Sequence, residues 1–76
     1  MKTLADFDLP HEFETLGGYK ATVCGINYAC LPNQVCGFLE DGEGVTVEDW
    51  NLNGGYMRDG TESNFDIIIP QGDSNE

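Results

Sequence analysis

The stretch from Val35 to Met57 reads VCGFLEDGEGVTVEDWNLNGGYM and carries the clearest turn signals of the chain. An apolar run from Val35 to Leu39 is followed by the acidic glycine turn Asp41–Gly44 and by a second run from Val45 to Trp50. Extended apolar runs separated by short glycine turns are typical of antiparallel strands. This stretch therefore predicts a strand, a tight turn and a second strand.

The Asn53-Gly54 pair comes directly after this second run. Asn-Gly readily supplies the two positive φ angles of a type I′ hairpin turn, so we expect residues 50–52 to pair with residues 55–57. Val45 and Val47 share one strand parity and Trp50 has the other, which indicates either a bulge or a Trp50 side chain on the opposite face.

Further strand patterns lie on both sides of this stretch. Tyr19–Ile26 is rich in β-branched and aromatic residues, and Phe65–Ile69 forms a last apolar run that Pro70 ends. The ten glycines are spaced so that runs of about 6 to 12 residues remain between turns, as in small barrels. The predicted fold is all-β: a small antiparallel sheet or a partly open barrel of about five strands.

The segment before Tyr19 fits two readings. Leu9, Phe13 and Leu16 have the spacing of a short helix, which leaves a possible N-terminal helical turn. Alternatively, residues 13–15 form a strand and Gly17-Gly18 a turn, and we favour this reading because a helix of two turns is short for independent stability.

The chain has the length of one small domain. We expect an N-terminal arm over residues 1–12, a single β domain over residues 13–70 and a flexible acidic tail over residues 71–76. The predicted core consists of Phe13, Tyr19, Ala21, Val23, Val35, Phe38, Val45, Val47, Trp50, Tyr56, Ile67 and Ile69.

Three cysteines, Cys24, Cys30 and Cys36, are separated by five residues each. An odd count without close C-x-x-C pairs favours free thiols over disulfides or zinc ligands. We expect Cys24 and Cys36 to be small buried strand residues. Apolar runs such as Ile67–Ile69 are far shorter than the ~18 residues of a membrane span, and no signal-peptide pattern is visible, so the predicted location is the cytoplasm.

Charge restricts the partners. Fourteen acidic residues against three basic ones give a formal net charge of -11 and a pI near 4.1. This charge repels phosphate, which excludes direct binding to nucleic acid or to anionic membranes. The expected partner is a basic protein surface.

Chemistry-bearing motifs are sparse. Nucleophilic catalysis needs a histidine or lysine beside a nucleophile, and the chain has one histidine, His11, and two lysines. The oxygen-rich loops at residues 41–43 and 59–66 lack the spacing of a calcium loop. We therefore predict no enzymatic activity, no metal and no cofactor.

Trp50 and Tyr56 flank the Asn-Gly turn and support two interpretations. They form a cross-strand aromatic pair that stabilises the hairpin, or they form an exposed aromatic anchor within an acidic rim. The second interpretation defines the candidate binding residues, which are Asp41, Glu43, Glu48, Asp49, Trp50, Tyr56, Asp59 and Glu62.

The order of these elements, from Thr15-Leu16-Gly17-Gly18 through Trp50-Asn51-Leu52 to Phe65-Asp66-Ile67, resembles that of small uncharacterised β-rich proteins of tailed phages and prophages. The resemblance covers about residues 13–70 and rests on turn glycines, one Trp and a terminal apolar strand. It implies an SH3-like barrel and a setting in the cytoplasm of a bacterial host, where small acidic proteins are often inhibitors. No catalytic residue carries over.

Two functions are therefore open. The first is an acidic, nucleic-acid-mimicking inhibitor of a host defence or nucleic-acid-handling protein. The alternative is a structural or assembly module of a phage particle or replication complex, which binds through an exposed apolar edge and the face formed by Trp50 and Tyr56. We expect a monomer or a weak homodimer in either case.

Overall fold

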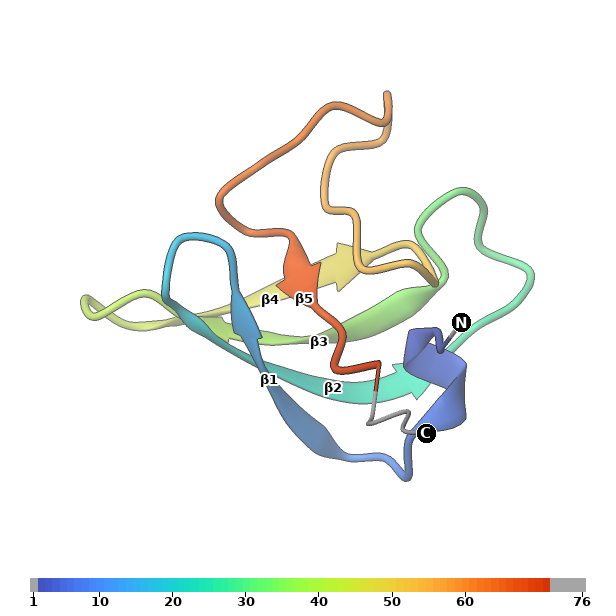
Figure 1. The fold of residues 1–76 in the computed structure, drawn as a ribbon, viewed down its shortest axis with the longest axis horizontal. Coiled ribbons are helices and arrows are strands. Elements are labelled where there is room, and N and C mark those ends of the chain that lie inside the picture. Colours follow the sequence, from blue (N-terminus) through green and yellow to red (C-terminus); the bar gives the residue numbers. More distant parts are fainter. Residues whose placement is uncertain (1, 72–76) are drawn as a thin grey trace.

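The computed structural model describes residues 2–71 (Figure 1). A short 3-10 turn, η1 (Leu4–Asp6), precedes the first strand. The five strands are β1 (His11–Thr15), β2 (Lys20–Ile26), β3 (Val35–Glu40), β4 (Val45–Trp50) and β5 (Ile67–Ile68).

All five strands form one antiparallel open sheet in the order β4-β3-β2-β1-β5. The all-β, five-stranded fold predicted from the sequence is confirmed. Neighbours in sequence are neighbours in the sheet except for β5, which returns to the free side of β1. β4 and β5 are thus the two edge strands, and β4 lies at the edge away from the N-terminal strand (Figure 1).

The sheet is curled (Figure 1), and the pairing between β2 and β3 is irregular. The register shifts by one residue at Cys24, between the Val23 and Gly25 pairings, which is a β-bulge. Beside the bulge, a Cβ added to Gly37 would collide with the backbone carbonyl of Thr22 and lie 2.9 Å from the Cα of Val23. Only glycine permits so close an approach of two backbones.

Curling brings the β5 side of the sheet back toward the end of β4. The Ile67 N–H donates to the Gly54 carbonyl at 2.8 Å, and the Trp50 indole N–H donates to the Phe65 carbonyl at 2.8 Å. These bonds connect the two ends of the sheet through the segment after β4 rather than through a continuous strand ladder.

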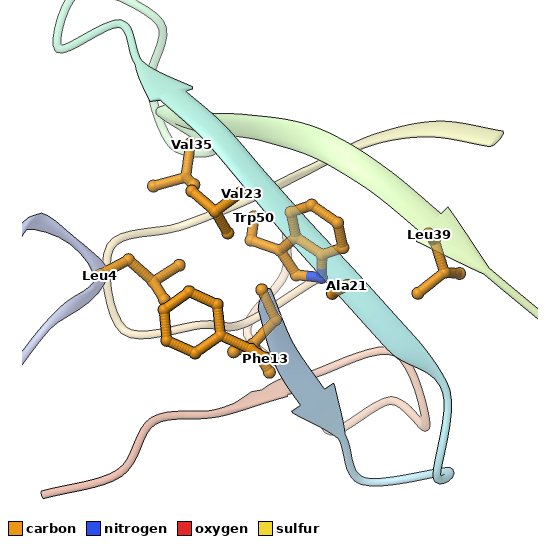
Figure 2. Close-up of a cluster of buried hydrophobic side chains, with 8 residues drawn as sticks. Leu4, Phe13, Ala21, Val23, Val35, Leu39 and Trp50 are labelled. Atoms are coloured by element: carbon orange, nitrogen blue, oxygen red, sulfur yellow. The ribbon is translucent and has the colours of Figure 1, made fainter. Parts of the chain in front are cut away.

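The core lies on the inner face of this curled sheet, where side chains from η1 and all five strands converge (Figure 2). Leu4 closes one side of the core, so the N-terminal segment is part of the packed structure. The buried hydrophobic residues are Leu4, Phe13, Ala21, Val23, Val35, Leu39, Trp50 and Ile67.

The prediction of the core is wrong at three positions. Phe38, Val45 and Val47 are 43%, 60% and 74% exposed. β3 directs Val35 and Leu39 inward, so its parity turns Phe38 to the outer face. Phe38 pairs with Val47, and cross-strand partners lie on the same face, so the valines of β4 lie outside as well. Of the remaining predicted core residues, Tyr19, Tyr56 and Ile69 are partly buried against the core.

The strand reading of the N-terminal segment is correct and the helical reading over residues 9–16 is wrong. β1 alternates, with Phe13 and Thr15 buried and Glu12 and Glu14 exposed. β1 begins at His11, and the only helical turn among the described residues is η1. Residues 72–76 of the expected tail lie outside the described residues.

The predicted type I′ hairpin at Asn53-Gly54 does not form. A type I′ turn needs a positive φ at both Asn53 and Gly54. Gly54 has a φ of 90°, but Asn53 does not have a positive φ, because only glycines do among the described residues. The turn instead runs from Asn51 to Gly54, with the Gly54 N–H on the Asn51 carbonyl at 2.9 Å. The Asn51 N–H donates to the Gly55 carbonyl at 2.8 Å, so residues 51 and 55 still meet across this turn. The Asn51 side chain also accepts from the Asn53 and Gly55 N–H groups.

The three cysteines are free and exposed. The expected burial of Cys24 and Cys36 is wrong because the bulge and the parity of β3 place both on the outer face of the sheet.

Candidate interaction site

The predicted site residues fall into separate regions. Asp41 and Glu43 lie in the β3–β4 turn, at the opposite end of β4 from Trp50. Glu48 and Asp49 lie near the end of β4, whereas Asp59 and Glu62 lie in the long segment between β4 and β5.

Four of these residues come together. Glu48, Asp49, Tyr56 and Asp59, with Met57 and Arg58, line a shallow depression between the end of β4 and the segment that follows it. We call this depression the acidic hollow. Glu62 lines a different depression beside Asp66, and Asp41 and Glu43 line neither.

Glu48 is held by two neutral hydroxyl groups. The Tyr56 hydroxyl donates to its Oε1 at 2.8 Å, and the Thr46 hydroxyl donates to its Oε2 at 2.9 Å. The bond to Glu48, followed by burial and by the negative charges of Glu48 and Asp49, raises the pKa of Tyr56. Tyr56 therefore remains a neutral donor, and neither hydroxyl brings a positive charge to Glu48.

Asp49 is the one acid of the hollow with a cationic partner among residues 2–71. Arg58 Nη2 lies 3.2 Å from its Oδ2, and both side chains are substantially exposed. Exposed pairs of this kind contribute about 0–1 kcal/mol to stability. Because Arg58 is one cation among the three acids of the hollow, it only partly offsets the local negative charge.

Asp59 is stabilised as an anion by the turn that it begins. Its Oδ1 accepts from the Thr61 backbone N–H at 3.0 Å and from the Thr61 hydroxyl at 2.7 Å. These two bonds lower the pKa of Asp59. Asp59 and Glu48 thus present charge that no cation neutralises within the described chain.

Asn33, which the sequence did not single out, organises the hollow from beneath. It is 3% exposed, and its Nδ2 donates to Asp49 Oδ1 at 2.9 Å and to the Tyr56 carbonyl at 3.0 Å. The amide thereby joins the β2–β3 loop, β4 and the following segment. No pattern around Asn33 distinguishes it from an ordinary loop asparagine, because its partners are distant in sequence.

Trp50 is not an exposed anchor. It is 0% exposed and packs in the core, with its ring centroid 6.5 Å from that of Tyr56 in an edge-on arrangement. The aromatic contact expected between Trp50 and Tyr56 therefore exists, across the turn from Asn51 to Gly55 rather than across a type I′ turn. Tyr56 alone of the two reaches the acidic hollow.

Within residues 2–71, no three histidine, cysteine or carboxylate side chains gather in a group that could hold a metal ion. No helix in the same range is long and apolar enough to cross a membrane. Comparisons of the chain with protein-family models, with curated proteins and with solved structures found no match. The resemblance to phage proteins therefore stays a prediction.

Proposed function

We propose that this chain acts by binding a basic surface of another protein through the acidic hollow, without catalysis. The observation that carries the proposal is the grouping of Glu48, Asp49 and Asp59 beside Tyr56 at the end of β4. Glu48 and Asp59 have no cationic partner within residues 2–71, and acids without such a partner attract a cationic surface. Tyr56 adds a rigid aromatic group of the kind enriched at interfaces.

The resemblance to phage and prophage proteins indicates the class of partner. We propose a bacterial host protein that either handles nucleic acid or defends the host. Such a protein has a basic channel for phosphates, and an array of carboxylates competes with nucleic acid for it. In this proposal the chain is an inhibitor that works in the host cytoplasm.

Affinity capture from bacterial lysate at low and high salt tests the proposal when matched variants are compared. The double variant Glu48→Gln, Asp59→Asn removes two charges from the hollow while keeping oxygen acceptors. The control Glu12→Gln, Glu14→Gln removes the same charge from the exposed face of β1. We expect the hollow variant to weaken capture of a basic protein about tenfold at low salt, and the control to change it little.

Equal loss in both variants would show that net charge alone, and not the hollow, attracts the partner. Capture that is insensitive to salt would contradict an electrostatic interface.

A second function, assembly into a phage particle or replication complex, is favoured by one observation. Phe38, Val45 and Val47 form an exposed apolar patch on the outer face of the edge of the sheet. Exposed apolar patches mark interaction surfaces. Here Val47→Ser would abolish salt-independent capture of virion proteins, whereas the variant of the acidic hollow would leave it intact.

A further inference from the structure

The edge of β4 next to the acidic hollow is open. β4 is the last strand in the sheet order and pairs only with β3. Within the described chain, no backbone-to-backbone hydrogen bond outside that ladder involves residues 45–50. An open edge strand is a template for one more strand.

The direction of the free backbone groups follows from the turn before β4. The Asp41 N–H donates to the Gly44 carbonyl at 3.2 Å, so this pair is a hydrogen-bonded one. Bonded and non-bonded pairs alternate along an antiparallel ladder. Thr46 therefore bonds to β3, and Val45 and Val47 direct their N–H and C=O groups to the open edge.

The two faces of this edge differ in chemistry. Val45 and Val47 lie on the outer face and are exposed, together with the neighbouring Phe38. Thr46 and Glu48 have the opposite parity and share the other face. A strand laid against β4 would find an apolar row on one face, and on the other the carboxylate of Glu48.

We propose that β4 binds an extended segment of the partner that alternates apolar and basic residues, so that the segment adds a sixth strand to the five-stranded sheet. Apolar side chains of the segment would cover Val45 and Val47, and its lysines or arginines would lie against Glu48. This inference rests on the proposed function, because it assigns the shape of the basic partner.

Charge argues against a second copy of this chain as the occupant. Two chains that each carry a formal net charge of -11 repel one another. Pairing two β4 edges would also bring the acids at the end of one strand near those of the other. A basic segment gains both the backbone bonds and the attraction.

A peptide of alternating lysine and valine serves as the probe, and the same peptide with alternate backbone nitrogens methylated serves as its comparator. Both carry the same charge, but only the first offers a full set of N–H donors. We expect the unmodified peptide to bind at least tenfold more tightly at low salt. Its binding should slow hydrogen exchange of the Val45 and Val47 amides at least tenfold, and leave that of the Thr46 amide unchanged.

The variant Val47→Pro removes the N–H of residue 47, which points to the open edge. Because this N–H makes no bond to β3, the hydrogen bonds between β4 and β3 are kept. Val47→Ala is the control, since it trims the side chain and keeps the donor. With the fold checked by circular dichroism, we expect the proline variant to lose at least tenfold in peptide affinity and the alanine variant about threefold or less. Hydrogen exchange on the unaltered protein decides the matter even if the proline variant does not fold.

The outcomes separate the two proposals. Equal binding of both peptides, or binding without protection of the Val45 and Val47 amides, would overturn strand addition and leave the acidic hollow standing. Absence of binding by either peptide at low salt would overturn both proposals.

Discussion

Replacing Gly37 with alanine should remove a large part of the folding stability because β2 and β3 meet too closely at this point. The added Cβ would collide with the Thr22 carbonyl oxygen and lie 2.9 Å from the Thr22 carbonyl carbon and the Val23 Cα. Ordinary van der Waals contact begins at 3.4 Å, so β2 would have to retreat by about 0.5 Å from the carbon atoms alone, as 3.4 − 2.9 shows. All these atoms are backbone, which no rotamer change can move aside.

Overpacking of a well-packed site costs about 1–3 kcal/mol, and displacing the backbone of paired strands puts Gly37→Ala at the upper end, at about 3 kcal/mol. Domains have only about 0.05–0.15 kcal/mol of stability per residue, so this is a large part of the total. At about 4–8 °C per kcal/mol for a domain of this size, the melting temperature should fall by about 12–24 °C.

Urea denaturation followed by the fluorescence of the buried Trp50 measures the loss. Gly25→Ala is the matched control, since Gly25 lies on β2 beside the same bulge and a Cβ there would meet nothing within 4 Å. We expect the control to change stability by about 1 kcal/mol or less. If Gly37→Ala also stays within about 1 kcal/mol of the unaltered protein, the close approach of the two strands is refuted.

Three other substitutions test the core and the site. Trp50→Phe should lower the free energy of unfolding, measured by urea denaturation, by about 2 kcal/mol, since the Phe65 carbonyl loses the indole N–H as its donor. The bond to Glu48 is the chief cause of the raised pKa of Tyr56, whose ordinary value is 10.0. The contribution of Tyr56 to the free energy of unfolding should therefore be complete below pH 10.0 and be lost as the pH rises through the pKa of the folded state. The stability difference between the unaltered protein and Tyr56→Phe should therefore shrink in alkali; a constant difference would contradict the bond. Asn33→Asp should place a carboxylate against Asp49 and lower the free energy of unfolding by about 2 kcal/mol or more at neutral pH. Part of that loss should be recovered in acid. If the melting temperatures of the variant and the unaltered protein differ by the same amount at all pH values, the contact is contradicted.

Alternation and turn residues made most of the sheet predictable. The strands at Tyr19–Ile26 and Val35–Leu39 have β-branched and aromatic residues between glycine turns, and they appear as β2 and β3. What alternation cannot show is which parity faces inward when both are apolar. β3 offers Phe38 on one side and Leu39 on the other, and the structure buries Leu39 and exposes Phe38.

The candidate site was predictable in part. The charge and the acids around Tyr56 are visible in the sequence, and the structure brings Glu48, Asp49 and Asp59 into one hollow. Trp50 was predicted both as a core residue and as an exposed anchor, and the core prediction is confirmed. The sequence could not decide between the two, because the indole partner is the carbonyl of Phe65, a residue far along the chain. Asn33 was missed for the same reason.

The exposed thiols have a consequence for handling the protein in air. Cys24, Cys30 and Cys36 are all open to solvent, so an oxidant reaches them without any unfolding. Covalent dimers and higher species then form between molecules, and on a sizing column they resemble genuine oligomers. The molecular mass in solution should therefore be measured with and without a reductant, and only a dimer that persists in the reductant reflects the folded surface.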